Sequence, residues 1–201
     1  MMGRTHLLLG LNALWLLEGM GSVVMTMGMP APLAEPLGLA VPLGNAERFV
    51  LCTGLAMLGA LLPDLDAASS LLQSASIKGV QPLVPLGQVL HRRYGHRGFL
   101  HSLSALGRVG ILSSPLLLLD LSLWFWPWVS LLLGYLSHLL GDACTKSGVP
   151  LFWKANALKQ QSFHLLPRPL CLTTGSQAEE AVFAFCGALD LMLALRHLPP
   201  L

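Results

Sequence analysis

Long apolar segments separated by polar stretches make up most of the chain. Spanning a bilayer takes roughly 20 mainly apolar residues, with about 17 as a lower limit. The segments that approach this pattern are residues 7–29, 46–62, 100–119, 124–140 and 181–195, of which the last carries Asp190 and is the weakest. The pattern predicts one all-α domain over residues 1–201, a polytopic membrane helix bundle of about five transmembrane helices with two long loops.

One of these loops contains a short amphipathic pattern. Leu86, Val89 and Leu90 stand at positions i, i+3 and i+4, next to Arg92 and Arg93. This arrangement predicts a short helix over residues 85–93 that lies on the membrane surface. Residues 30–45 are rich in Pro and Gly and predict an irregular loop on the other side of the membrane.

Composition supports a membrane protein and excludes several other classes. The chain has 201 residues, of which 54% are hydrophobic and 11% are charged, against about 25% charged residues in an ordinary soluble domain. A net charge of +2 is too small to indicate polyanion binding, so we expect no nucleic-acid partner. The four cysteines show no CxxC spacing, so neither a disulfide framework nor a thiolate zinc site is indicated.

The basic residues predict the orientation. With five spans, nine of the twelve Lys and Arg residues fall on the side of the N-terminus and of the two long loops, residues 63–99 and 141–180. The positive-inside rule therefore places the N-terminus and both loops in the cytoplasm. If residues 181–195 do not span, the C-terminus changes sides and the two loops stay where they are.

Ionisable side chains gather at this same side. Carboxylates and imidazoles lie at or near the ends of all five apolar segments: His6, Asp64, Asp66, His96, His101, His138, Asp142 and Glu179. Such groups are costly at membrane depth and usually mark a functional site. Imidazole and carboxylate together suit a divalent metal, with zinc first and manganese or iron as alternatives.

Each member of this set also has a simpler interpretation. His138 and Asp142 share a helix face, and such a pair alone is more often a structural hydrogen bond. Asp64 and Asp66 follow Pro63 and can simply end a helix. His96 and His101 converge only if the glycines at 95 and 98 form a turn.

Together, the candidate ligands exceed the needs of one tetrahedral metal. Either two metals bind, or some members orient the ligands or act as bases. His91, His164 and His197 lie outside the pattern and are interpreted as ordinary surface or interface residues.

The chain also resembles a known family. The matching blocks, in order, are Thr-His-Leu-Leu at 5–8, Leu-Leu-Pro-Asp-Leu-Asp at 61–66, Gly-His-Arg-Gly-Phe-Leu-His-Ser at 95–102, Gly-Tyr-Leu-Ser-His-Leu-Leu-Gly-Asp at 134–142, Thr145, Gly-Val-Pro-Leu at 148–151, and Gly175 with Glu179. They are similar to the bacterial inner-membrane, LexA-regulated type of metal-dependent hydrolase (YdjM-like). That family usually has His-Pro where this chain has Ala67 and Ala68.

The resemblance implies a set of metal ligands. It predicts that they come from His6, Asp64, Asp66, His96, His101, His138 and Asp142. The family also looks distantly similar to zinc-dependent phospholipases C and P1-type nucleases, all-helical enzymes that hydrolyse phosphoesters at multi-metal sites. That second step is an analogy of fold and site.

The leading hypothesis is a metal-dependent hydrolase at the cytoplasmic membrane interface, acting on a phosphoester such as a membrane lipid phosphate or a lipid-linked substrate. Asp66 or Glu179 would act as the base. Arg97 would stabilise developing negative charge, or would instead face lipid headgroups. The alternatives are a non-catalytic membrane protein with a structural metal site and, ranked lower, a transporter. The oligomeric state is left open.

Overall fold

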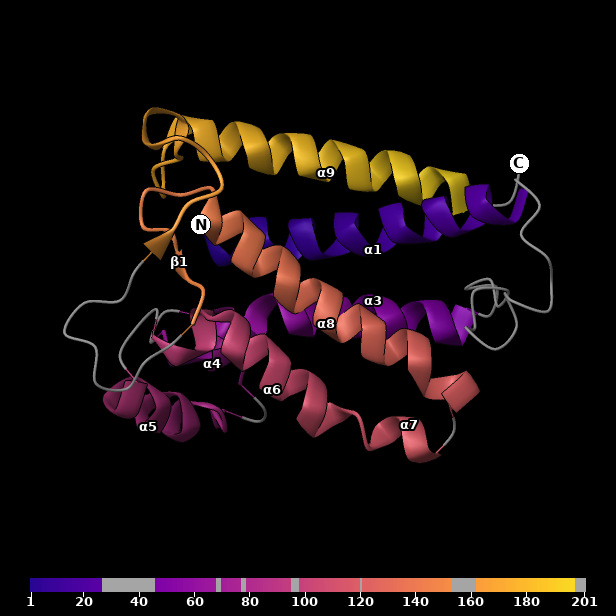
Figure 1. The fold of residues 1–201 in the computed structure, drawn as a ribbon, viewed down its shortest axis with the longest axis horizontal. Helices are drawn as coiled ribbons and strands as arrows, with labels where there is room; N and C mark the ends of the chain where they lie inside the picture. The colour runs from indigo at the N-terminus through magenta and orange to yellow at the C-terminus, as the bar shows by residue number, and fades with distance from the viewer. Residues whose placement is uncertain are drawn as a thin grey trace.

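The centre of the protein is a bundle of long helices (Figure 1). The computed structural model describes residues 1–26, 46–67, 70–76, 79–94, 98–119, 121–152 and 162–197. The long helices in this part of the chain are α1 (Gly3–Thr26), α3 (Ala46–Leu61), α8 (Leu121–Ala143) and α9 (Gln177–His197). Helix α1 packs against the other three, and α3 packs most extensively against α8. The chain is therefore mainly α-helical, as the apolar pattern predicts.

Short elements connect the long helices. They are η1 (Leu62–Asp66), α4 (Leu71–Ser74), α5 (Val84–Tyr94), η2 (Phe99–His101), α6 (Leu103–Ser113), α7 (Leu116–Leu119), β1 (Val149–Pro150), β2 (Ser162–Phe163) and η3 (Arg168–Leu170). Strands β1 and β2 pair antiparallel, with Val149 opposite Phe163. In Figure 1, α4, α5 and β1 lie at the end of the bundle that carries the N-terminus. Helices α6 and α7 pack along α8.

The predicted apolar segments correspond closely to helices, with one exception. The prediction of a single apolar segment over residues 100–119 is wrong as one helix, because α6 ends at Ser113 and α7 begins only at Leu116. Pro115 stands between them, has no backbone N–H to donate and clashes with the carbonyl four residues earlier. The surface helix predicted over residues 85–93 is confirmed as a helix, α5. The predicted loop at 30–45 lies outside the described residues.

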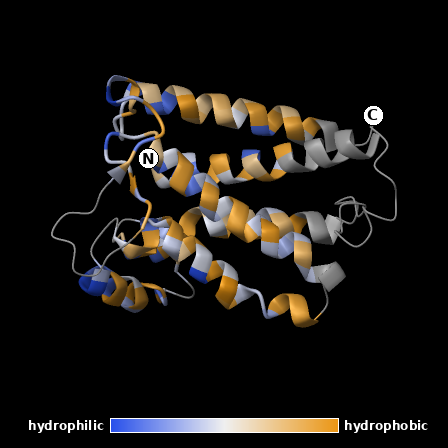
Figure 2. Cartoon of the chain, viewed as in Figure 1, coloured by the Kyte–Doolittle hydropathy of each residue, from blue (hydrophilic) through white to orange (hydrophobic). Residues whose placement is uncertain are grey.

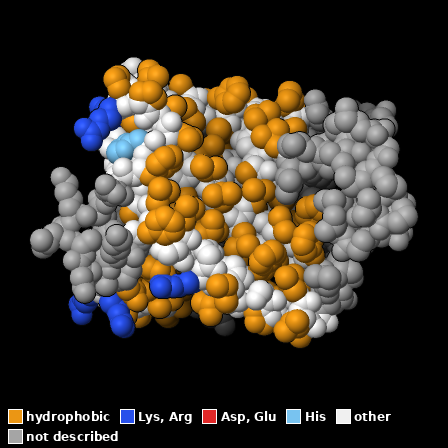
Figure 3. All heavy atoms as spheres, in the orientation of Figure 1, with side chains coloured by type: hydrophobic (Ala, Val, Ile, Leu, Met, Phe, Trp, Pro, Cys, Tyr) orange, Lys and Arg blue, Asp and Glu red, His pale blue; other side chains and the backbone are white. Residues whose placement is uncertain are grey.

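The helices are apolar over much of their length (Figure 2). On the face drawn in Figure 3, hydrophobic side chains cover much of the described surface, and Lys and Arg lie toward the end that carries β1 and α5. Large apolar side chains such as Ile111 and Leu118 are 72% and 88% exposed. Across the described residues, none of the helices has both the length and the hydropathy that a membrane-crossing segment needs.

Helices α3 and α8 approach each other closely at two glycines. A Cβ atom on Gly59 would lie 2.0 Å from the Leu131 carbonyl oxygen, and one on Gly134 would lie 2.0 Å from the Ala56 carbonyl oxygen. Only glycine allows two helix backbones to come this close, as small residues do at helix contacts in membranes. This contact sets the spacing between the end of α3 and the second half of α8.

A capping serine fixes the start of α6. The buried Ser102 side chain accepts a hydrogen bond of 3.2 Å from the Ala105 backbone N–H. We expect Ser102→Ala to lower the free energy of unfolding by about 1 kcal/mol, the usual cost of losing such a cap. Thermal unfolding in detergent measures the change. The control is Ser114→Ala, which removes an exposed hydroxyl that donates to the Ile111 carbonyl one turn earlier. This variant should change the free energy of unfolding by less than about 0.5 kcal/mol.

Candidate metal centre

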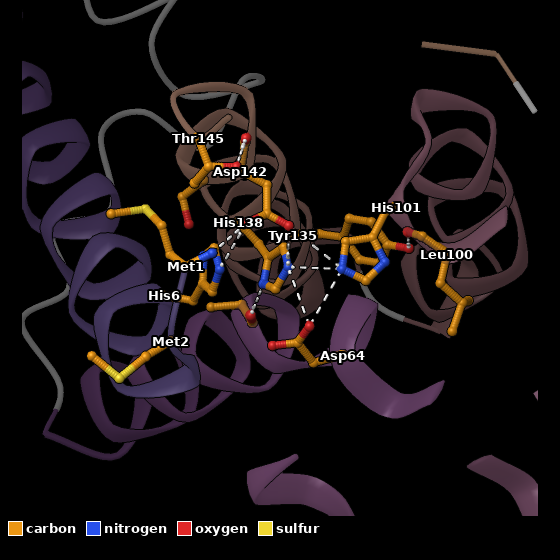
Figure 4. Close-up of polar contacts among 12 residues, drawn as sticks. Met1, Met2, His6, Asp64, Leu100, His101, Tyr135, His138, Asp142 and Thr145 are labelled. Carbon is orange, nitrogen blue, oxygen red and sulfur yellow. Dashed lines mark hydrogen bonds and ion pairs between the residues drawn. The ribbon is translucent and has the colours of Figure 1, made fainter. Parts of the chain in front are cut away.

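Four segments bring His and Asp side chains together at one end of the bundle (Figure 4). Helix α8 supplies His138 and Asp142 one turn apart, η1 supplies Asp64, η2 supplies His101, and α1 supplies His6. Two groups of three can each hold a metal ion, and they share His138: His6 with His138 and Asp142, and Asp64 with His101 and His138. The structure therefore brings together five of the side chains that the sequence predicts as metal ligands.

Asp64 and Asp142 both approach the facing nitrogens of His101 and His138. The Nε2 atoms of His101 and His138 lie 3.4 Å apart. Asp64 Oδ1 lies 3.3 Å from His101 Nε2 and 3.8 Å from His138 Nε2. Asp142 Oδ2 lies 3.6 Å and 3.7 Å from the same two nitrogens. Bond lengths of about 2.0–2.2 Å to zinc place tetrahedral ligand atoms about 3.3–3.6 Å apart. The atoms of Asp64, His101 and His138, 3.3–3.8 Å apart, therefore fit one ion with small adjustments.

A backbone contact orients the shared histidine. His138 Nδ1 lies 2.7 Å from the carbonyl oxygen of Ala60, near the end of α3. Because a carbonyl oxygen only accepts hydrogen bonds, Nδ1 carries the proton and donates it. The lone pair of the neutral ring is then on Nε2, which faces His101, Asp64 and Asp142. This is the usual way in which a protein orients a metal-binding histidine.

His6 is buried beside this group. Its ring stacks on the His138 ring, with 3.6 Å between the centroids and 16° between the planes. His6 Nε2 lies 3.4 Å from Asp142 Oδ1, yet neither ring nitrogen makes a hydrogen bond within the described part of the chain. Buried polar atoms without a partner are rare. The His6 nitrogens therefore fit a site that receives an ion or another ligand.

The two carboxylates of the centre are ionised at neutral pH. Both lie just beyond the predicted spans at 46–62 and 124–140. Burial by itself raises the pKa of Asp64, but the adjacent imidazoles of His101 and His138 outweigh it and lower the pKa to about 2. The same balance, with His138 and His6, holds the pKa of Asp142 well below its usual range. Two ionised carboxylates in one buried cluster suit a divalent cation.

Asp142 uses its two oxygens differently. Oδ2 faces His101 and His138, whereas Oδ1 lies 2.7 Å from the α-amino group of Met1 and near His6. At the end of α8, the Thr145 hydroxyl donates a 2.7 Å hydrogen bond to the Asp142 carbonyl oxygen. These contacts fix the backbone and the side chain of Asp142 from opposite directions.

A tyrosine holds the loop that carries His101. The buried Tyr135 hydroxyl donates to the Leu100 carbonyl oxygen, which joins η2 to α8. Sequence reasoning missed this role, and it also missed the Ala60 carbonyl. A signal for Tyr135 was present, since it precedes His138 by three residues and therefore shares its helix face.

The other predicted site residues lie elsewhere. Asp66 is buried in η1 but belongs to neither group of potential ligands, and its carbonyl oxygen lies 3.1 Å from His91 Nδ1. The carboxylate of Glu179, at the start of α9, accepts hydrogen bonds from the Met2 and Gly175 backbone N–H groups. It therefore ties the N-terminal residues to α9. His96 and Arg97 lie outside the described residues.

The sequence predicts that His91, His164 and His197 are ordinary surface or interface residues. His91 is exposed but contacts the backbone of η1, so it has a packing role as well. His164 Nε2 lies 3.1 Å from the Lys146 carbonyl oxygen, in an exposed contact. The side chain of His197 lies outside the described residues.

Fold and site together define an all-helical bundle protein with a buried His/Asp cluster that can hold a metal ion. The chain belongs to the YdjM inner membrane protein family, whose profile matches residues 1–186. Two relatives named "Inner membrane protein YdjM", from Escherichia coli (strain K12) and Shigella flexneri, are each 42% identical over 101 residues. That alignment covers 49% of this chain and 46% of each relative, so the chain matches about half the length of these relatives.

No solved structure matches the chain. The distant similarity to phospholipases C and P1-type nucleases therefore stays a prediction. The family assignment indicates a bacterial inner membrane protein.

Proposed function

We propose that this chain is a metal-dependent hydrolase embedded in the bacterial inner membrane, with a phosphoester such as a lipid phosphate as its substrate. The observation that carries the proposal is the pair of three-residue groups that share His138, in each of which the ligand atoms lie within 4.8 Å of one another. The nitrogens of His6, which make no hydrogen bond within the described residues, lie directly beside it.

We also propose five spans, with the N-terminus and the metal centre on the cytoplasmic side. The basic side chains on the face in Figure 3 lie toward the end that carries β1 and α5, which supports this orientation under the positive-inside rule. A substrate with a lipid tail in the bilayer could then present its polar group to the metal centre. The location of the centre favours a membrane lipid or a lipid-linked substrate.

One of the two three-residue groups, Asp64 with His101 and His138 or His6 with His138 and Asp142, would hold the metal and leave a position for water. Zinc is the first choice of metal, and manganese or iron are the alternatives. When bound, such a metal lowers the pKa of a coordinated water to about 7 and so supplies a nucleophile at neutral pH. His138 keeps its Nε2 lone pair available through its bond to Ala60. We keep Asp66 as the proposed base, because backbone N–H groups already occupy both oxygens of Glu179. Arg97 is the proposed anion-binding cation.

The test is release of inorganic phosphate from phosphatidate and from a polyprenyl phosphate by detergent-purified, metal-loaded protein. We expect Asp64→Asn to lower turnover at least about 100-fold, because it removes one charged ligand from the centre. Glu180→Gln is the matched control, since Glu180 is an exposed carboxylate on α9 that pairs with Arg4. That variant should retain wild-type turnover.

A structural metal site is the second candidate function. It is favoured by the origin of the candidate ligands, because an ion held by Asp64, His101 and His138 would join η1, η2 and α8. Structural sites are closed, whereas catalytic sites keep a position open for water. Folded, metal-loaded protein that releases no phosphate from either substrate, and that unfolds when the metal is removed, would support the structural site and contradict the hydrolase.

A further inference from the structure

Helix α5 has one face packed against the segment that carries Asp64. Gly87 is buried there, and a Cβ atom on it would lie 2.5 Å from the Leu65 carbonyl oxygen. The same carbonyl accepts a 2.7 Å hydrogen bond from Gln73 Nε2. One turn further along α5, His91 Nδ1 lies 3.1 Å from the Asp66 carbonyl oxygen. The contacts of Gly87 and His91 place α5 against Leu65 and Asp66, the two residues that follow Asp64 in η1.

The opposite face of α5 is exposed and carries both apolar and basic side chains. Leu86 is 49% exposed and Val89 is 59% exposed, and Arg93 continues the same stripe one turn later. Arg92 and Arg93 are both exposed, in the last turn of the helix. Figure 2 shows α5 apolar over part of its length and hydrophilic at one end.

We propose that this exposed face, defined by Leu86, Val89, Arg92 and Arg93, docks on a bilayer surface that contains anionic phospholipid. Apolar side chains next to arginines on one short helix are typical of interfacial helices. The arginines complement the negative charge of phospholipid headgroups, an attraction that salt screens. The face is a short stretch of one 11-residue helix, much smaller than the roughly 800 Å² per partner that a stable protein interface buries. A lipid surface therefore fits better than a second protein.

Docking would also act on the metal centre. Because α5 packs on the Leu65 carbonyl at Gly87 and contacts the Asp66 carbonyl through His91, a shift of the helix would move η1, and with it Asp64. Contact with the membrane surface would thus hold Asp64 in its place 3.3 Å from His101 Nε2. This second step rests on the metal centre of the proposed function, whereas the docking itself does not.

The experiment measures how accessible α5 is in the intact, reconstituted protein. Val89→Cys protein is placed in vesicles of phosphatidylcholine alone or of phosphatidylcholine with phosphatidylglycerol, and is labelled with a membrane-impermeant maleimide from the exposed side. Labelling of wild-type protein, which has four free cysteines among the described residues, is subtracted. We expect labelling about tenfold slower in the anionic vesicles.

Two further variants make the result specific. Adding Arg92→Gln and Arg93→Gln to Val89→Cys should restore rapid labelling in anionic vesicles, and Thr174→Cys, at another exposed position, should label equally in both. Equal labelling of Val89→Cys in the two lipids overturns the proposal. Protection in both lipids that grows with protein density assigns the face to a second copy and also overturns it. Metal content is measured on the same samples, so a protein without metal contradicts the proposed function and not the docking.

Discussion

His138→Ala is expected to remove the bound metal from the protein, and any metal-dependent turnover with it. His138 belongs to both groups of potential ligands, and its Nε2 lies within 3.4–3.8 Å of ligand atoms on three neighbours. Residues that only orient a metal ligand already change metal affinity about 10- to 100-fold when replaced, so loss of the shared ligand should cost more. We expect elemental analysis of chelator-free, detergent-purified protein to give about one ion per wild-type chain and only traces in the variant.

The control for this experiment is another histidine. His164→Ala removes a ring that lies outside both ligand groups, with its Nε2 3.1 Å from the Lys146 carbonyl oxygen, and it should retain wild-type metal content. Folding of each variant is checked by gel filtration and thermal unfolding. Well-folded wild-type protein that binds no metal after supplementation would contradict the metal centre. The cluster would then be a polar network that joins helix ends.

Gly134→Val is expected to prevent folding. A Cβ atom at this position would lie 2.0 Å from the Ala56 carbonyl oxygen and 2.8 Å from its carbonyl carbon. Since these are backbone atoms of a packed helix, no change of rotamer relieves the clash, and α3 and α8 must move apart. Overpacking usually costs about 1–3 kcal/mol, and a clash with backbone should exceed that range. We expect aggregation, or no cooperative unfolding transition, in detergent.

Gly54→Ala is the matched control on α3. A Cβ atom at Gly54 meets nothing within 4 Å among the described residues. Alanine is favoured over glycine inside a helix by about 0.5–1 kcal/mol, so this variant should be as stable as wild type or slightly more so. A Gly134→Val protein that unfolds like wild type would show that the two helices do not approach as closely as the structure describes.

Much of the helical fold could be predicted from the apolar pattern. The pattern identifies the long helices because burial of apolar side chains favours them wherever they pack. It failed at residues 100–119, where composition stays apolar but Pro115 removes a backbone donor and splits the segment. The glycines at 59 and 134 could not be assigned to a helix contact, since nothing in the sequence says which helices become neighbours.

The candidate site was predicted in part. His138 and Asp142 could be placed together from their spacing alone. The structure also brings Asp64, His101 and His6 beside them. Asp66 and Glu179 have the same chemistry, yet one belongs to neither ligand group and the other binds backbone N–H groups. That difference depends on turn geometry in η1 and on where α9 begins. Residue type and spacing do not encode either feature.

The order of the ligands along the chain has a consequence for biogenesis. His6, Asp64 and His101 are synthesised before His138 and Asp142, and both potential ligand groups include His138. During translation neither group is complete until α8 has left the ribosome and packed against α3, whose Ala60 carbonyl orients the shared ring. Acquisition of the ion would then be a late step of maturation, confined to chains whose helices have already assembled.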